Sequence, residues 1–301
     1  MNSKIIEHYL KFSTYTFPGL YQDKLKNDLP DDIREIGLLV RKNFIHRTTL
    51  TDGNTGTNSD LKFGDMTKVP WWRQTEDDIL PTTGAMLVEL YHRDARGFML
   101  DRKPENKLVL SCRYVAVMMA SILKSKGIPA RVRSGHASFF HMGDLGNVAT
   151  DHWINQYWDR EDDRWVTLDV DGSLSLNESF DPYDMPPNKF NFPADDWLNI
   201  RSGKIDPKYF HNGGGQQGQV VILWSLFYDF HSLMNSEILY TFGPVGASAL
   251  NEESLKDFGE EKLSKIDNLA KLMQDPDRNF DELMNIWETQ RDFRLLRGGL
   301  L

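Results

Sequence analysis

The segment from Ser111 to Gly127 carries the clearest helix pattern in the chain and constrains what can fold around it. Serine is a favoured N-cap residue, and Gly127, followed by Pro129, is a typical helix stop. Apolar side chains at positions 115, 118, 119, 122 and 123 line the segment and predict that the helix is buried. Cys112 therefore lies in the first turn of a helix that its surroundings hold rigidly.

Two segments of strand character follow this helix. Residues 151–158 and 164–170 are rich in aromatic and β-branched side chains, and the polar stretch 159–162 separates them. This pattern predicts an antiparallel hairpin with a turn in the polar stretch.

The hairpin is expected to bring an imidazole and a carboxylate together. The expected register pairs Trp158 with Asp163, Ile154 with Thr167 and His152 with Asp169. Directly opposed side chains have Cβ atoms about 5 Å apart, so Asp169 would orient the His152 ring and stabilise its protonated form. Asp171, two residues further on, is a competitor for the carboxylate role.

Helical patterns flank this central part on both sides. Helices are predicted over Pro30–His46 and Thr83–Arg93, and the apolar run Val220–Tyr228 reads as a buried helix too short to span a bilayer. The tail shows further helical stripes from Leu263 to Met273 and from Phe280 to Trp287. We expect an α+β fold divided into an N-terminal helical part (1–100), a catalytic core (101–210) and a C-terminal helical region (211–301).

The composition argues against several classes of partner and site. The chain of 301 residues has 35 basic and 44 acidic side chains, a net charge of -9, which disfavours nucleic acid as a partner. The first twenty residues lack the apolar core of a signal peptide and no segment is long enough to cross a membrane, so we expect a cytoplasmic protein without a membrane partner. A single cysteine excludes an internal disulfide and a cysteine-rich zinc module.

Cys112 is therefore either a small buried hydrophobe or a reactive thiol. The positive end of a helix favours a thiolate, but it contributes only about 0.3 to 1 kcal/mol and at best about 2. Strong activation needs a cationic neighbour as well. His152, oriented by Asp169, is the predicted neighbour, and the three residues together favour a nucleophilic site.

Four motifs in this order resemble the transglutaminase-like superfamily, whose members share a papain-like Cys, His, Asp triad. They are Ser111-Cys112-Arg113-Tyr114-Val115-Ala116, Lys126-Gly127-Ile128-Pro129-Ala130-Arg131, Asp151-His152-Trp153 and Trp165-Val166-Thr167-Leu168-Asp169. The flank Val40-Arg41-Lys42-Asn43-Phe44-Ile45-His46 is similar to bacterial members with no assigned substrate. The resemblance implies that Cys112 is the nucleophile, His152 the general base and acid, and Asp169 the orienting carboxylate. It also implies a fold in which the cysteine-bearing helix packs on an antiparallel sheet.

The resemblance also suggests where an acyl oxygen would bind. Members of the superfamily complete the oxyanion hole with the backbone N–H of the cysteine and an upstream Trp or Gln. Trp71 and Trp72 are candidates for that donor or for packing in a substrate groove, and Trp153 is a further candidate lining residue.

These features predict acyl transfer at a peptide or protein amide through a thioester. Hydrolysis is favoured over transfer to an amine, because amine transfer requires a path that excludes water. Two alternatives remain: a binding protein that keeps the fold without turnover, and a metal site built from His136, His141, His152 and Cys112. The leading hypothesis needs no cofactor and no metal, and the sequence does not predict the oligomeric state.

Overall fold

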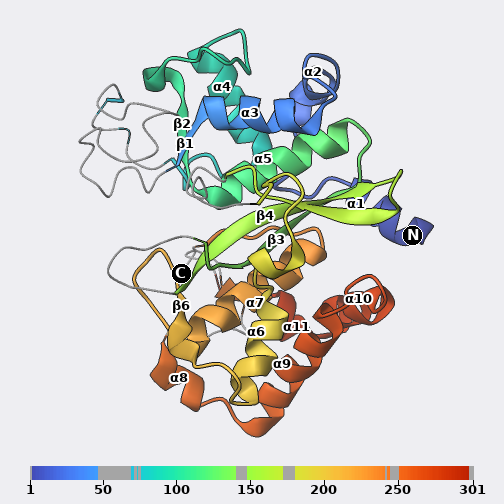
Figure 1. Cartoon of the computed structure of the whole chain (residues 1–301), viewed down its shortest axis with the longest axis vertical. Helices are drawn as coiled ribbons and strands as arrows, with labels where there is room; N and C mark the ends of the chain where they lie inside the picture. Colours follow the sequence, from blue (N-terminus) through green and yellow to red (C-terminus); the bar gives the residue numbers. More distant parts are fainter. Residues whose placement is uncertain are drawn as a thin grey trace. The chain divides into compact units, whose positions relative to one another are not determined.

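The computed structural model describes residues 2–46, 69–70, 73, 76–139, 148–171, 180–240, 243–244 and 251–297. The chain forms two compact units. The first comprises Met1–Val132 and Ile154–Pro186, and the second comprises Arg133–Trp153 and Pro187–Leu301. Helices and a mixed sheet together give the expected α+β class (Figure 1). The division into 1–100, 101–210 and 211–301 stays a prediction.

Short helices dominate the first unit. Its elements are α1 (Ser3–Leu10), η1 (Gly19–Tyr21), α2 (Gln22–Asn27), α3 (Ile33–Asn43), β1 (Phe44–His46), α4 (Thr83–Arg93), η5 (Pro104–Asn106), β2 (Leu108–Leu110), α5 (Cys112–Ser125) and β5 (Arg164–Leu168). Helices α2, α3 and α4 all contact α5, and Figure 1 shows them grouped around it. Helix α5 is thus the element on which this unit is built.

The expected helix at the cysteine is confirmed. All fourteen residues of α5 are buried, and Ser111 occupies the N-cap position with extended backbone angles. Gly127 has a φ of 77°, a left-handed conformation that glycine adopts at little cost, and the N–H of Ile128 donates to the carbonyl of Leu123. This is the geometry with which helices commonly end at a glycine.

The helix predicted over Pro30–His46 is shorter than expected. It starts at Ile33 and stops at Asn43, and Phe44–His46 forms strand β1 instead. The buried side chain of Asn43 donates to the carbonyls of Leu39 and Met99, 2.7 and 2.8 Å away. Its oxygen accepts from Arg102 at 2.6 Å. These tertiary bonds fix Asn43 at the helix end, so the chain leaves the helix three residues before His46.

The predicted hairpin is present, but its register was wrong by two residues. Strand β4 (Ala149–Asp159) pairs antiparallel with β5, and Thr167 lies opposite Gln156 rather than Ile154. The turn covers 160–163 and closes through Asp163, which adopts a φ of 50°. Asp159 accepts from two backbone N–H groups of the turn, so it pairs as the last strand residue. The pairing ends at Asn155 and Leu168, before either His152 or Asp169.

The central sheet has the strand order β3–β4–β5, with the short strand β6 (Phe210–His211) also on β4. The β4–β5 pair is antiparallel and the β4–β6 pair is parallel. Strands β3 (Ala130–Ala137) and β4 contribute residues to both units. In the first unit, the Asn155 side chain donates to the Ala116 carbonyl at 2.9 Å, which ties β4 to α5.

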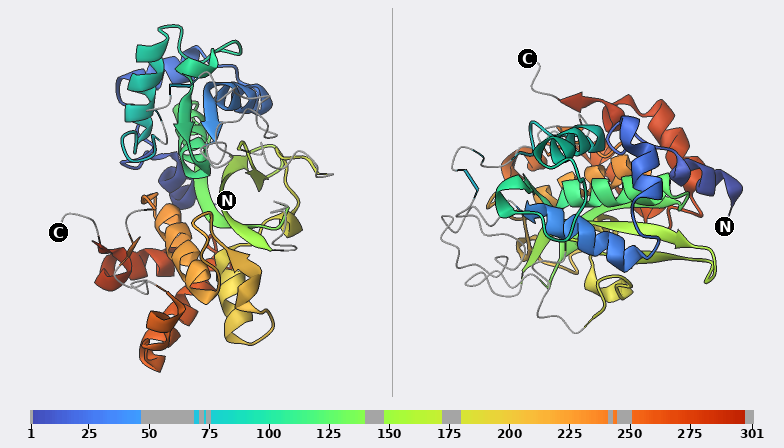
Figure 2. Two further views of the ribbon diagram at one scale, coloured as in Figure 1. Left: turned by 90° about the vertical axis from the view of Figure 1, so that its left-hand side faces the viewer. Right: turned by 90° about the horizontal axis from the view of Figure 1, so that it is seen from above.

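The second unit is mainly helical, as the tail pattern predicted. Its helices are α6 (Pro193–Arg201), α7 (Gln219–Leu233), α8 (Glu252–Lys256), α9 (Glu260–Met273), α10 (Phe280–Thr289) and α11 (Arg291–Arg294), with short turns η8 (Pro187–Lys189) and η9 (Pro207–Tyr209) and the strand pair β7 (Gly243–Pro244) and β8 (Leu296–Arg297). Helix α6 contacts both α7 and α9, and Figure 2 shows these yellow to orange helices together. The run Val220–Tyr228 lies within α7 and is largely buried. Of the helices that the structure describes, none has both the length and the apolar character of a membrane span.

Buried polar groups join β3 to the helices of this unit. Asp229 of α7 is fully buried and accepts from the Arg133 guanidinium at 2.7 and 2.8 Å. His136 lies between Ser225, whose Oγ is 3.4 Å from Nε2, and Asp196, whose carboxylate is 3.8 Å from Nδ1. Burial lowers the pKa of His136 to about 3 and raises the pKa of Asp196 to about 8. Both groups are therefore neutral in the folded protein near pH 7.

These two groups predict a pH-dependent stability. Asp196 ionises above about pH 3.8 in the unfolded chain but only near 8 in the fold, so its ionisation lowers the free energy of unfolding between these values, by up to about 1.4 kcal/mol per pH unit. His136 acts in the opposite direction, because only the unfolded chain binds its proton between pH 6.5 and 3. Below about pH 6.5 the two effects offset each other, so we expect the Asp196→Asn variant to lose the decline between about pH 6.5 and 8 in denaturant titrations.

A matched control is Asp195→Asn, since Asp195 is the exposed neighbour on the same helix. Burial is the largest cause of the Asp196 shift and Asp195 a lesser one, so most of the pH dependence should survive in this control. An unchanged slope in Asp196→Asn would contradict the assignment.

Candidate active site

A short parallel strand pair carries His46 to the start of α5. Strand β1 pairs with β2 in the register Phe44 with Leu108, Ile45 with Val109 and His46 with Leu110. Both strands are buried along most of their length. Because parallel strands end at the same edge, His46 at the end of β1 lies next to Ser111 and Cys112, which follow β2. The 66-residue separation between His46 and Cys112 is closed in this way.

The other edge of β2 is held by a buried carboxylate. Glu76 is 2% exposed; its side chain accepts from the Val109 N–H at 2.8 Å, and its own N–H donates to the Val109 carbonyl. Burial by itself raises the pKa of Glu76, but hydrogen bonds from Arg93, Arg73 and Val109 outweigh it and lower the pKa below the usual value. Glu76 therefore stays ionised and fixes the strand that leads into the cysteine.

Side chains from outside α5 cap its first turn. Ser111 sits at the N-cap, but its hydroxyl makes no capping hydrogen bond. Its N–H donates to the buried carboxylate of Asp77 at 2.9 Å, and the N–H of Cys112 donates to Nε2 of His46 at 3.1 Å. The first backbone N–H groups of a helix have no partner within the helix. Asp77 and His46 therefore accept hydrogen bonds from two N–H groups that would otherwise have no acceptor in the interior.

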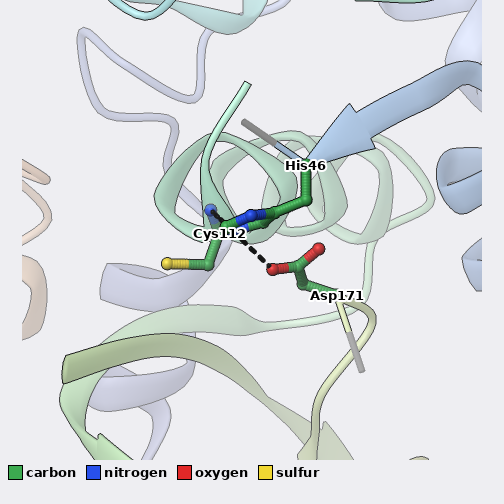
Figure 3. Close-up of side chains that lie close together, drawn as sticks. All are labelled: His46, Cys112 and Asp171. Carbon is green, nitrogen blue, oxygen red and sulfur yellow. Dashed lines mark hydrogen bonds and ion pairs between the residues drawn. The ribbon is translucent and has the colours of Figure 1, made fainter. Parts of the chain in front are cut away.

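His46, Cys112 and Asp171 form one cluster, shown in Figure 3. Nε2 of His46 lies 3.1 Å from a carboxylate oxygen of Asp171, and both side chains are less than a tenth exposed. Cys112 is 6% exposed. The imidazole nitrogen, the sulfur and the carboxylate oxygen all lie within 4.8 Å of one another. Figure 3 shows the sulfur directed away from the imidazole, while the backbone nitrogen of Cys112 faces it.

Nε2 of His46 thus lies 3.1 Å both from a hydrogen-bond donor, the Cys112 N–H, and from a carboxylate oxygen of Asp171. Nε2 accepts from the Cys112 N–H through its lone pair, whereas a hydrogen bond to ionised Asp171 requires a hydrogen on the same atom. An imidazole nitrogen holds either a lone pair or a hydrogen in its ring plane, never both. In the structure Nε2 is the acceptor for the Cys112 N–H, and its contact with Asp171 is an ion pair only when the imidazole is protonated.

The same three residues offer donors of the kinds that bind transition metals. Thiolate, imidazole and carboxylate suit Zn²⁺, and the nitrogen to oxygen distance of 3.1 Å is close to that between two ligands of one tetrahedral ion. Any such ion would take the Nε2 lone pair that accepts from the Cys112 N–H, and it would bind the sulfur that a nucleophilic reaction requires. The metal site predicted from His136, His141, His152 and Cys112 has a different set of ligands: His136 is fully buried against Ser225 and Asp196, and His141 lies outside the described residues.

The predicted site residues lie in different parts of the chain. Cys112 and Asp169 belong to the first unit, and Asp169 is 2% exposed with its N–H donating to the Pro182 carbonyl. His152 belongs to the second unit, is 2% exposed, and has its ring edge-on to Phe139 with centroids 6.4 Å apart. The roles of His152 and Asp169 stay predictions.

The candidate lining residues are placed as follows. Trp153 is 1% exposed and packs against Tyr228 and Tyr240, each 5.8 Å away between ring centroids. Trp71 and Trp72 lie outside the described residues. Their assignment to a substrate cleft or an oxyanion hole stays a prediction.

Sequence reasoning gave His46 no chemical role. It counted His46 as the end of a helix, which hid the strand that aims this residue at Cys112. The available signal was the pair of short apolar segments 44–45 and 108–110, each placed just before a chemically capable residue. The sequence pattern makes Asp171 a competitor of Asp169 for the carboxylate role at His152, rather than a neighbour of His46.

Cys112, His46 and Asp171 lie close together at the start of a helix, which is consistent with a papain-like triad. The comparisons agree: the family model described as "Transglutaminase-like superfamily" matches residues 104–170, about a fifth of the chain. This match confirms the resemblance derived from the motifs. The matched range contains Cys112, His152 and Asp169, while His46 and Asp171 lie outside it. No curated protein and no solved structure gave a match.

The capping carboxylate generates a prediction. Replacing Asp77 with Ala removes a charge-assisted acceptor from the Ser111 N–H, so we expect a loss of about 1.5 to 3 kcal/mol in the free energy of unfolding. The control is Asp78→Ala, because Asp78 is exposed and surface changes cost within about 0.5 kcal/mol. Denaturant titration of both variants measures the difference, and equal stabilities would contradict the role given to Asp77.

Proposed function

We propose that this protein is a cysteine-dependent acyl-transfer enzyme that acts on amide bonds and that Cys112 is its nucleophile. The observation that carries the proposal is the environment of Cys112: the first position of a fully buried helix, with His46 on its backbone N–H and Asp171 beside the imidazole. A structural cysteine needs none of these partners. The positive end of α5 favours the thiolate, which is the reacting form.

We assign the general base to His152 and its orienting carboxylate to Asp169. Both residues stand within the matched range, in the chain order that the motifs indicate. The direction of the Cys112 sulfur also supports a base other than His46, since the sulfur points away from the His46 ring (Figure 3). His152 would take the thiol proton and later return a proton to the departing amine.

The proposed reaction proceeds through a thioester. The sulfur of Cys112 attacks the amide carbonyl, the amine leaves with the proton from His152, and water then releases the acid. We favour water over a second amine as the acceptor, because amine transfer requires a water-excluding path in addition to the triad. Peptide or protein amides are the proposed substrates, the cytoplasm is the proposed compartment, and no cofactor takes part in these steps.

The thiol should be unusually reactive. We expect iodoacetamide at pH 6 to alkylate Cys112 at least about ten times faster than a model thiol, because only thiolate reacts. His152→Asn should slow this rate, whereas His92→Asn, which changes an exposed histidine of α4, should not. Cys112→Ala should abolish amidase activity with little change in the thermal midpoint. A rate equal to that of a model thiol, with no effect of His152, would overturn the triad.

The acyl acceptor can be tested separately. A peptide library incubated with the protein and a labelled primary amine should yield hydrolysed peptides without incorporated label. Cys112→Ala protein is the control for reactions that do not depend on the thiol. Label incorporated into the products would replace hydrolysis by transglutamination as the proposed activity.

A further inference from the structure

The acyl oxygen needs a binding site in the proposed reaction, and this inference therefore rests on the proposed function. When a thiolate attacks a carbonyl, the oxygen becomes negative and is stabilised by N–H donors about 2.7 to 3.1 Å away. The backbone N–H of Cys112, at the positive end of α5, is one such donor beside the reacting sulfur. In the resting structure this N–H points at the His46 imidazole.

We infer that His46 is a further catalytic residue, which binds the acyl oxygen through Nε2–H together with the backbone N–H of Cys112. The two nitrogens lie 3.1 Å apart. A single oxygen about 2.9 Å from each nitrogen, a distance typical of such hydrogen bonds, can accept from both once the ring has turned away from the Cys112 N–H. Both donors are buried, so their hydrogen bonds to a charged oxygen are stronger than they would be in water.

Asp171 favours the protonated form of Nε2 that His46 needs in order to donate to the acyl oxygen. Its carboxylate lies 3.1 Å from Nε2 and is less than a tenth exposed, so in its ionised form it stabilises the state in which Nε2 carries a hydrogen. That hydrogen is available to the acyl oxygen when negative charge develops there. Asp171 is thus a positioning residue that acts through His46.

The placement of His46 separates this role from that of the base. Nε2 faces the amide side of Cys112, whereas the sulfur is directed to the other side (Figure 3). A base must reach the thiol proton, while an oxyanion donor must reach the space next to the Cys112 N–H. Strand β1, fixed to β2 by its parallel pairing, holds the ring at the second of these places.

The thiolate of Cys112 forms a C–S bond to the acyl carbon, and the electron pair of the C=O π bond moves to the oxygen. The oxygen accepts hydrogen bonds from Cys112 N–H and His46 Nε2–H without taking either proton. Its electron pair then re-forms the C=O bond while the C–N bond breaks, and the amine leaves with the electron pair of that bond and the proton from His152.

Two probes separate this role from activation of the thiol. Iodoacetamide alkylates sulfur by displacement, without an oxyanion, whereas p-nitrophenyl acetate acylates sulfur through one. In the 301-residue chain, we expect His46→Ala to slow acylation, measured as release of p-nitrophenolate, by about 100-fold. Its alkylation by iodoacetamide should stay within about twofold of the unchanged protein. His46→Gln keeps an amide donor at similar reach and should recover much of the acylation rate.

Each outcome has a distinct meaning. His92→Ala, an exposed histidine in the same unit, is the control and should change neither rate. If His46→Ala slows both reactions equally, or if Gln fails to restore acylation in a folded variant, the inference is wrong. If His46→Ala changes neither rate while Cys112 remains hyperreactive, the inference is wrong and the proposed function stands. If Cys112 of the unchanged protein reacts with both probes like a model thiol, the proposed function itself fails.

Discussion

The structure of the first unit depends on how the N-terminal backbone N–H groups of α5 are satisfied. A helix leaves its first N–H groups without intrahelical acceptors, and this helix begins in the interior, where water cannot serve them. Asp77 accepts from Ser111 and His46 accepts from Cys112. The serine hydroxyl, the expected cap, does not take part. The start of α5 is therefore capped by residues from elsewhere in the chain. One of them, His46, places an imidazole next to Cys112.

This arrangement is supported by polar groups buried at a distance from the thiol. Asn43 ends α3 and lets β1 begin, and Arg102 binds Asn43 through its oxygen. Glu76, kept ionised by Arg73 and Arg93, holds β2 from its other edge. Buried charges are costly unless they are paired and hydrogen-bonded, so these groups define one geometry for the strand pair. The precision of the site comes from this frame rather than from the cluster itself.

The sequence predicted the parts of the fold that depend on local signals. The helix from Ser111 to Gly127 and the turn between β4 and β5 follow from N-cap, glycine and polar patterns within a few residues. The register of the hairpin did not, because the turn has four residues in both registers, 159–162 as expected and 160–163 as observed, and composition does not show that Asp163 adopts a left-handed conformation. The end of α3 depended on a contact between Asn43 and residues near 100, which no local pattern contains. Cys112 was identified as the nucleophile candidate because its helix start is a local pattern. His46 was not, because its place at the Cys112 amide depends on the long-range pairing of β1 with β2.

The parallel pairing of β1 with β2 also has a consequence for how the protein is made. The groups gathered at the thiol come from positions 46, 112 and 171, so a nascent chain carries its cysteine long before the ribosome has delivered Asp171. Until then the thiol lacks the carboxylate that orders the imidazole, and closing such a long-range contact is slow compared with forming local helices. An incomplete or misfolded chain would therefore lack the assembled cluster of Cys112, His46 and Asp171. This cluster would form only after Asp171 has been synthesised and the first unit has folded.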